Sequence, residues 1–283
     1  MGAMVRALTF ADHGRDLDQN RYVYAVLSRR ARGLSVGVNM NPDKVCNFDC
    51  PYCQVDRTTP GGPSRIDVAS LGAELEDLLG RAQDGSLWQH PLFAPTPEDM
   101  RRISDVAFAG DGEPTTPPEF PAAAQRAREL VDRSGLGVPL RLLTNATMLD
   151  RPRVRETLPA FDELWCKLDA GTEEYFRVVD RTRFSFKKIL ENLLITAKER
   201  PIVIQSMFLS LDGVGPDEAE INAYLGRLRD IVAGGGTIDL VQVYTVARRP
   251  ADARVGALAD DRLQQIADRV TAAGLRAEVY GSA

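Results

Sequence analysis

Short apolar runs alternate with helix-like segments along most of this chain, and this alternation limits the folds open to it. The runs that read as strands lie at residues 34–40, 104–110, 140–145, 163–169, 202–209, 240–246 and 275–280. Between them, apolar residues at helical spacing predict helices at residues 70–80, 121–134, 151–158, 186–198, 218–233 and 260–273. Strands that alternate with helices pair in parallel, so the sequence predicts an α/β fold.

The length of 283 residues allows one large domain with ample burial. Six strand–helix units fit either a partial (β/α)6 barrel or a flat doubly wound sheet, and periodicity alone leaves both open. We predict one core domain over residues 34–283, preceded by a polar, arginine-rich extension over residues 1–33. Arg29, Arg30 and Arg32 in that extension read as a solvated face, with phosphate contact as the alternative.

Three of the four cysteines, Cys46, Cys50 and Cys53, follow the spacing C-x3-C-x2-C. Thiolates are soft ligands that suit iron–sulfur clusters, zinc and copper(I). A structural zinc site needs four closed ligands, and only His13 and His90 are present to complete one. Three clustered cysteines cannot all pair as disulfides. The pattern therefore favours a cluster with three cysteine ligands and one iron open to an external molecule.

Together with Tyr52, just before the third cysteine, this stretch resembles the signature of the radical S-adenosylmethionine (SAM) superfamily. Gly-Asp-Gly-Glu-Pro-Thr at 110–115, Leu-Thr-Asn at 143–145 and Lys-Leu-Asp-Ala at 167–170 follow in order. Together they are most similar to the branch that includes the wyosine-forming tRNA enzymes and many small relatives. The resemblance favours an α/β partial (β/α)6 TIM-type barrel with parallel strands. In a barrel of this type, sites gather at the carboxyl ends of the strands, where each of these motifs lies.

The resemblance also implies the cofactors, which are one [4Fe-4S] cluster on Cys46, Cys50 and Cys53, and SAM. The amino and carboxylate groups of SAM bind the open iron. An external electron donor such as flavodoxin or ferredoxin supplies the electron that cleaves SAM to methionine and a 5′-deoxyadenosyl radical. That radical abstracts hydrogen from a substrate. A non-catalytic iron–sulfur electron carrier or cluster-binding scaffold is the alternative.

The residues expected to hold SAM follow from the matched motifs and from strand ends. In the family, the stretch with Asp111, Gly112, Glu113 and Pro114 recognises the methionine amino group, although Asp111 stands where a glycine is usual. The other candidates are polar side chains at strand ends and the aromatic beside the cluster: Tyr52, Thr144, Asn145, Lys167, Asp169, Gln205 and Ser206.

Two of these candidates, Lys167 and Asp169, lie two residues apart on a predicted strand and so point to the same side. Because a charge inside a barrel is costly unless paired, they are expected to pair with each other, with SAM or with the substrate. Cys166 points the other way and reads as a packed core thiol. Phe48 reads either as a shield of the cluster or as ordinary packing.

Polar residues also end the strand at 240–246, where a substrate-selecting side of the site is expected: Gln242, Tyr244, Thr245, Arg248 and Arg249. Arg248 is a candidate for an anionic group, with an ordinary surface arginine as the alternative. The proline-broken stretch 83–100 reads as a packed surface loop or as a lid.

Composition limits the setting of the reaction. Charged residues make up 27% of the chain and the net charge is −5, which argues against a protein that coats nucleic acid. No apolar run approaches the length of a membrane span, and the few cysteines suit a reducing cytoplasm. The substrate stays open among an RNA base, a nucleoside or nucleotide, a small metabolite and a peptide. Wyosine-forming relatives carry a second cluster built from additional cysteines, and Cys166 alone cannot hold one.

Overall fold

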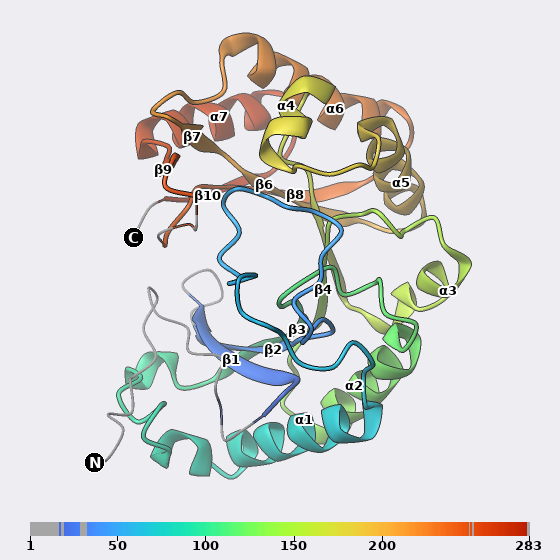
Figure 1. Cartoon of the computed structure of the whole chain (residues 1–283), viewed down its shortest axis with the longest axis vertical. Coiled ribbons are helices and arrows are strands. Elements are labelled where there is room, and N and C mark those ends of the chain that lie inside the picture. The colour runs from blue at the N-terminus through green and yellow to red at the C-terminus, as the bar shows by residue number, and fades with distance from the viewer. Residues whose placement is uncertain (1–16, 18–19, 29–32, 249, 251, 282–283) are drawn as a thin grey trace. The chain divides into compact units, whose positions relative to one another are not determined.

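A computed structural model describes residues 17, 20–28, 33–248, 250 and 252–281. The predicted basic cluster of Arg29, Arg30 and Arg32 lies outside the described residues, as do His13 and Arg249. The chain forms two compact units (Figure 1). Unit 1 comprises residues 1–45, 60–142 and 156–162, and unit 2 comprises residues 46–59, 143–155 and 163–283.

Unit 1 is built on a strand set with order β1-β2-β3-β4. β2 pairs in parallel with β3, and β3 with the start of β4, as the alternation of strands and helices predicted. α1 and α2 pack against each other (Figure 1). The elements are β1 (Val23–Ser28), β2 (Gly33–Val38), α1 (Val68–Gln83), β3 (Ile103–Phe108), α2 (Phe120–Ser134) and β4 (Leu140–Thr144), which runs on into unit 2.

The core of unit 1 contains three fully buried aromatic rings. Phe108 meets Phe120 and Phe161 edge-on, at centroid distances of 6.1 and 5.2 Å, and Phe120 stacks on Phe161 at 5.8 Å. Such pairs add stabilisation beyond the apolar area that they bury. They join β3, α2 and the segment after the short helix η3 (Leu158–Ala160) into one core.

β1 was not predicted, because the sequence analysis placed its residues in the N-terminal extension. It pairs antiparallel with β2, from Val23 opposite Val38 to Ser28 opposite Gly33. Gly37 makes room for this strand, since a Cβ at that position would lie 2.1 Å from the ring of Tyr24. The run Val-Tyr-Ala-Val-Leu was the available signal. Residues 23–28 therefore belong to the sheet of unit 1.

The stretch 83–100 is proline-broken, as predicted, and holds two short 3-10 helices, η1 (Ser86–Gln89) and η2 (Glu98–Met100). Leu87 and Phe93 on it are fully buried. These side chains make it a loop packed into unit 1, in line with the first of its two interpretations.

Unit 2 is built on four parallel strands with order β5-β6-β8-β10. All six residues of β6 are buried, including Gln205 and Ser206, so these two polar side chains need hydrogen-bond partners inside the protein. A separate antiparallel pair joins β7 to β9. The elements are α3 (Pro152–Arg155), β5 (Glu163–Lys167), α4 (Glu173–Val179), α5 (Phe186–Glu199), β6 (Ile202–Met207), β7 (Leu209–Leu211), α6 (Glu218–Ala233), β8 (Ile238–Tyr244), β9 (Val255–Ala257), α7 (Asp260–Ala272) and β10 (Ala277–Tyr280).

Side-chain caps fix where three helices of unit 2 begin. Ser185 accepts from the N–H of Lys188 at α5, and Asp217 accepts from the N–H of Glu220 at α6. Thr172 caps α4, a helix of seven residues that the sequence analysis missed. Its signal was the capping threonine followed by Glu173 and Glu174, since acidic residues favour the first turn of a helix.

Candidate functional site

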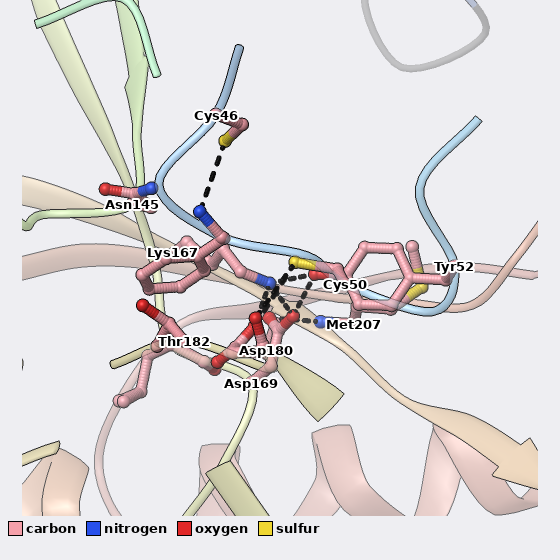
Figure 2. A network of polar contacts seen from close by, with 12 residues as sticks. Cys46, Cys50, Tyr52, Asn145, Lys167, Asp169, Asp180, Thr182 and Met207 are labelled. Atoms are coloured by element: carbon pink, nitrogen blue, oxygen red, sulfur yellow. Dashed lines mark hydrogen bonds and ion pairs between the residues drawn. The ribbon is translucent and has the colours of Figure 1, made fainter. Parts of the chain in front are cut away.

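The three clustered cysteines lie on one loop of unit 2. They are reduced and half-buried. The Cys53 N–H donates to the Cys50 carbonyl at 2.9 Å, which closes a tight turn between these two residues. Cys46 Sγ accepts from the Phe48 N–H at 3.5 Å (Figure 2), and Arg57 lies 3.6 Å from Cys53 Sγ. The three thiols therefore lie on one loop, each half-buried and each with its own neighbours.

Asn47, inside this loop, fixes it to the rest of unit 2. Its amide donates to Thr147 Oγ1 at 2.7 Å and accepts from Asn145 Nδ2 at 2.6 Å. Its backbone carbonyl accepts from Thr182 Oγ1 at 2.9 Å. The loop is thus tied to the turn after β4 and to the segment after α4 by neutral hydrogen bonds.

A charged network lies directly behind the loop (Figure 2). Lys167 forms ion pairs with Asp169 and, at 2.7 Å, with Asp180. The Tyr52 hydroxyl accepts from Lys167 Nζ and donates to Asp169. Cys50 Sγ lies 3.7 Å from Asp180 Oδ1. The predicted pairing of Lys167 with Asp169 is therefore present, with Asp180 as a third member that the sequence analysis did not single out.

Burial governs the ionisation of this network. Burial raises the pKa of Asp180 to about 7, with Lys167 lowering it and Asp169 raising it. Burial also raises the pKa of Asp169, against Lys167. Burial would lower the pKa of Lys167, but the two carboxylates raise it well above its usual value. One ammonium thus faces two buried carboxyl groups, and the ammonium keeps its charge.

Cys50 lies at the edge of this network. Burial raises the pKa of its thiol well above the usual value, while Lys167 lowers it. The backbone of β6 also holds Asp169 in place, since its Oδ1 accepts from the Met207 N–H at 3.0 Å. The thiol, the ammonium and both carboxyl groups therefore share one enclosed environment.

Thr144 and Asn145 form the turn that follows β4. Thr144 Oγ1 accepts from the Ala146 N–H at 3.1 Å, and Asn145 Oδ1 accepts from the N–H and hydroxyl of Thr147 at 3.2 and 2.7 Å. Ala146 is buried with φ at 65°, a left-handed conformation that is costly for a residue with a side chain. The turn is held by its own side chains and presents Asn145 to the cysteine loop.

Gln205 and Ser206 on β6 also have partners within unit 2. Gln205 Nε2 donates to Gln242 Oε1 on β8 at 2.8 Å. Ser206 Oγ donates to the Leu168 carbonyl and meets the Tyr224 hydroxyl, both at 2.7 Å. These polar groups interrupt an apolar strand because neighbouring strands and α6 satisfy them.

The remaining predicted residues of unit 2 are spread over several environments. Cys166 is fully buried, as predicted for a core thiol. Phe48 is buried and packs edge-on against Phe176 at 5.9 Å. Thr245 Oγ1 accepts from the Leu258 N–H at 2.8 Å, while Arg248 is exposed.

The motif at residues 110–115 lies in unit 1, after β3, and it packs against the segment that leads to the cysteines. Asp111 accepts from Asn39 Nδ2 at 2.7 Å, and its N–H donates to Asn39 Oδ1 at 3.1 Å. A Cβ at Gly112 would lie 2.2 Å from the carbonyl oxygen of Val45, the residue before Cys46. Gly112 is therefore required for this close approach.

Glu113 and Pro114 are buried within the same turn. Glu113 Oε1 accepts from the N–H of Thr115 at 3.3 Å and from its hydroxyl at 2.5 Å. Charge-assisted bonds of this kind hold a carboxylate in one orientation. The turn thus holds the Glu113 carboxyl group in one orientation at the carboxyl end of β3.

Sequence reasoning missed several polar residues that this geometry brings forward. Asp180 and Thr182 stand in a polar run after the apolar end of α4, and Asn39 and Asn41 flank Met40 just after β2. Polar residues directly after an apolar run were the signal in each case. No single-sequence pattern, however, indicates that Asn47 joins two other segments.

The donor set fits an iron–sulfur cluster by its chemistry. Three reduced, half-buried thiols stand on one loop, and thiolates are the ligands that such clusters take. Among the described residues, no three His, Cys, Asp or Glu side chains converge as a ready-made cage for a single metal ion. The loop therefore carries the sulfur donors without gathering them around one point.

Comparison with known proteins establishes the family. The profile of the radical SAM superfamily matches residues 40–225, which include the cysteine loop and the predicted motifs at residues 110–115, 143–145 and 167–170. The chain belongs to the radical SAM superfamily. It is accordingly an enzyme, and this superfamily in general uses SAM, an iron–sulfur cluster and an electron donor.

Two curated relatives are each longer than the part of them that matches this chain. It is 24% identical over 253 residues to the GTPase Obg of Brachyspira hyodysenteriae, covering 88% of this chain and 33% of that protein. It is 28% identical over 174 residues to a UPF0026 protein of Methanocaldococcus jannaschii, covering 60% of this chain and 47% of that protein. The chain thus spans between a third and a half of the length of these two relatives.

Solved structures show the fold. A radical SAM methyltransferase from Sphaerobacter thermophilus matches 91% of this chain and 68% of its own, with TM-score 0.62 and 16% identity. The structure of TYW1 with a lysine-pyruvate adduct bound matches 91% of this chain and 85% of its own, with TM-score 0.56 and 14% identity. The predicted α/β partial (β/α)6 barrel is confirmed, and the predicted nearness to the wyosine-synthase-like branch is confirmed at the level of the fold.

In the described part of the chain, no helix combines the length and the apolar character that crossing a membrane requires.

Proposed function

We propose that this chain uses one [4Fe-4S] cluster, held by Cys46, Cys50 and Cys53, to cleave SAM reductively and to abstract hydrogen from a substrate. The observation that supports this most is the cysteine loop itself, with three reduced thiols and no fourth cysteine beside them. Three thiolates leave one iron of a four-iron cluster without a protein ligand. When bound, the cluster and SAM together supply the electron transfer and the radical.

The residues of the chain position and enclose these groups. Asn47 fastens the loop, and Lys167 with its two carboxylates supports it from behind. We propose that the turn with Asp111, Gly112, Glu113 and Pro114 receives the methionine part of SAM. The remaining predicted contacts stay proposals as well: Tyr52, Thr144, Asn145, Lys167, Asp169, Gln205 and Ser206. The protein's part in such chemistry is to bind, orient and exclude side reactions.

We propose that the substrate belongs to one of four classes, which are RNA bases, nucleosides or nucleotides, small metabolites, and peptides. We propose that one cluster serves whichever of these is the substrate. We also propose that residues 34–283 act as one core domain, to which the preceding extension, residues 1–33, adds the strand β1. The setting we propose is a reducing cytoplasm with flavodoxin or ferredoxin as electron donor, because an exposed cluster is sensitive to oxygen.

The test is direct. The protein is reconstituted anaerobically with iron and sulfide, and SAM and dithionite are then added. We expect 5′-deoxyadenosine and methionine in equal amounts. If a reconstituted four-iron protein yields no 5′-deoxyadenosine with dithionite or with reduced flavodoxin, the proposal is wrong. Deuterium transfer from labelled nucleosides, tRNA or metabolite extracts into 5′-deoxyadenosine then identifies the substrate class.

A further inference from the structure

The three cysteine sulfurs of the loop in unit 2 meet chemically different neighbours. Cys46 Sγ accepts from a backbone N–H, and Cys50 Sγ lies 3.7 Å from a carboxyl oxygen of Asp180. Cys53 Sγ instead lies 3.6 Å from Nη2 of Arg57, a guanidinium nitrogen that can only donate. Of these three contacts, the one at Cys53 is therefore the one made with a side-chain cation.

Two turns hold Arg57 within reach of this sulfur. The backbone N–H of Cys53 closes the first turn, which is the tight turn described above. In the second turn, Asp56 Oδ1 accepts from the N–H and hydroxyl of Thr58 at 2.9 and 2.6 Å, and Asp56 Oδ2 accepts from Thr59 Oγ1 at 2.8 Å. An aspartate that bonds the residues after it in this way fixes the backbone between them. Arg57 lies inside this second turn, so its side chain starts from a defined position.

Iron binding strengthens a contact of this kind. A cysteine that binds iron is a thiolate, and a hydrogen bond between two charged partners is stronger than one to a neutral thiol. Hydrogen bonds to the cysteine sulfurs are among the factors that set the reduction potential of an iron–sulfur cluster. Because reduction adds one negative charge to the cluster, a cation beside a ligand sulfur stabilises the reduced form more than the oxidised form. The contact between Arg57 and Cys53 therefore has the chemistry to raise that potential.

We propose that Arg57 acts through the Cys53 sulfur and raises the reduction potential of the cluster. This inference rests on the proposed function, since it needs the cluster on Cys53. The step that it assists is a one-electron transfer, in which the external donor loses one electron, the cluster gains it, and no bond or proton changes. Arg57 is not among the residues that the sequence analysis expected to bind iron or SAM. Because Arg57 is exposed, water and salt screen its charge, and the effect is moderate.

The test is a redox titration of the reconstituted protein under anaerobic conditions and without SAM, in which electron paramagnetic resonance measures the reduced cluster. Two neutral variants, Arg57→Gln and Arg57→Met, remove the charge. At the wild-type midpoint potential, we expect their ratio of reduced to oxidised cluster to be about twofold to fivefold lower, within the range of an exposed charge pair. This corresponds to a midpoint potential that is lower by roughly 20–40 mV. Arg57→Lys keeps a cation and should return the midpoint potential towards the wild-type value.

Arg229→Gln is the matched control, because it removes the same charge from an exposed position on α6 and should leave the midpoint potential unchanged. Iron and sulfide per chain are measured on every variant, so that only loaded clusters are compared. An unchanged midpoint potential in a loaded neutral variant, or an equal fall in Arg57→Lys or Arg229→Gln, overturns the inference. Failure of both neutral variants to take up the cluster also overturns it, because Arg57 would then serve assembly. In each of these cases, SAM cleavage by the wild type upholds the proposed function, whereas a wild type that takes up no four-iron cluster overturns both.

Discussion

The cysteine-loop network of unit 2 and the turn at residues 110–116 of unit 1 both hold buried polar groups at strand ends. The partners of these polar groups differ between the two. In unit 2, Lys167 meets Asp169, Asp180 and Tyr52. In unit 1, Asp111 accepts from the amide of Asn39, and Glu113 accepts from Thr115. The network of unit 2 therefore holds an ammonium between carboxyl groups, whereas the turn of unit 1 holds carboxyl groups on neutral donors.

This difference bears on how charge is read from a sequence. Lysine and aspartate on one strand drew attention as SAM contacts, because a buried charge needs a partner. In the structure, Lys167 and Asp169 form an ion pair with each other. Asn39 and Asn41 were not singled out, although a buried amide carries two groups that must both be satisfied. A charged residue in a buried strand therefore indicates a group that needs a partner, and it does not by itself identify a ligand contact.

The largest expected effect on this comparison comes from removing a proposed cluster ligand on the cysteine loop. After reconstitution, we expect Cys50→Ala to lack the visible absorbance of the cluster. It should therefore lose all SAM cleavage. Cys166→Ala should keep both, because that thiol is fully buried in the core. Iron and sulfide content per chain is the measurement. Loss of the cluster in Cys166→Ala would show that the ligand set is wrong.

The next effect concerns the supporting network. Lys167→Met leaves two buried carboxyl groups facing each other without their cation, and we expect the protein without cluster to lose about 3–5 kcal/mol of unfolding free energy. Urea unfolding measures it. Lys187→Met is the control, since Lys187 is 85% exposed and should change stability by less than about 0.5 kcal/mol. A Lys167→Met protein as stable as wild type would contradict a supporting role.

A smaller effect tests whether Gln205 is occupied by its protein partner. We expect Gln205→Leu and Gln242→Leu to be non-additive, with a coupling of about 0.5–1.5 kcal/mol in unfolding free energy, since their amides bond at 2.8 Å. A double-mutant cycle in urea without SAM gives this number. Additive losses would mean that each amide is satisfied independently of the other.

The smallest effect concerns the turn at residues 110–116, which we propose receives the methionine part of SAM. Thr116→Val removes the hydroxyl that donates to the Glu113 carbonyl and accepts from the Asn41 amide, whereas Thr116→Ser keeps it. We expect SAM to bind roughly threefold to tenfold more weakly to the valine variant, the value of one neutral hydrogen bond, and normally to the serine variant. Calorimetry on the two reconstituted variants decides it. Equal affinities would show that the Thr116 hydroxyl does not hold the turn in the form that binds SAM.

Much of the architecture could be predicted because it depends on local periodicity. The strands β2, β3, β4, β5, β6, β8 and β10 and the long helices α1, α2, α5, α6 and α7 all lie within a few residues of their predicted ranges. β1 and α4 were missed for different reasons. β1 was hidden in a segment judged by its arginines, and α4 is too short for a full apolar stripe.

The sequence by itself determined the cysteine spacing, the α/β alternation and hence the superfamily, because these depend on residues close together in the chain. Only the tertiary structure decided which polar groups satisfy one another. Asp180 joins Lys167, and Asn47 meets Asn145, across separations of 13 and 98 residues. The physical reason is that a hydrogen bond depends on distance and angle within a few tenths of an ångström, which no linear pattern records.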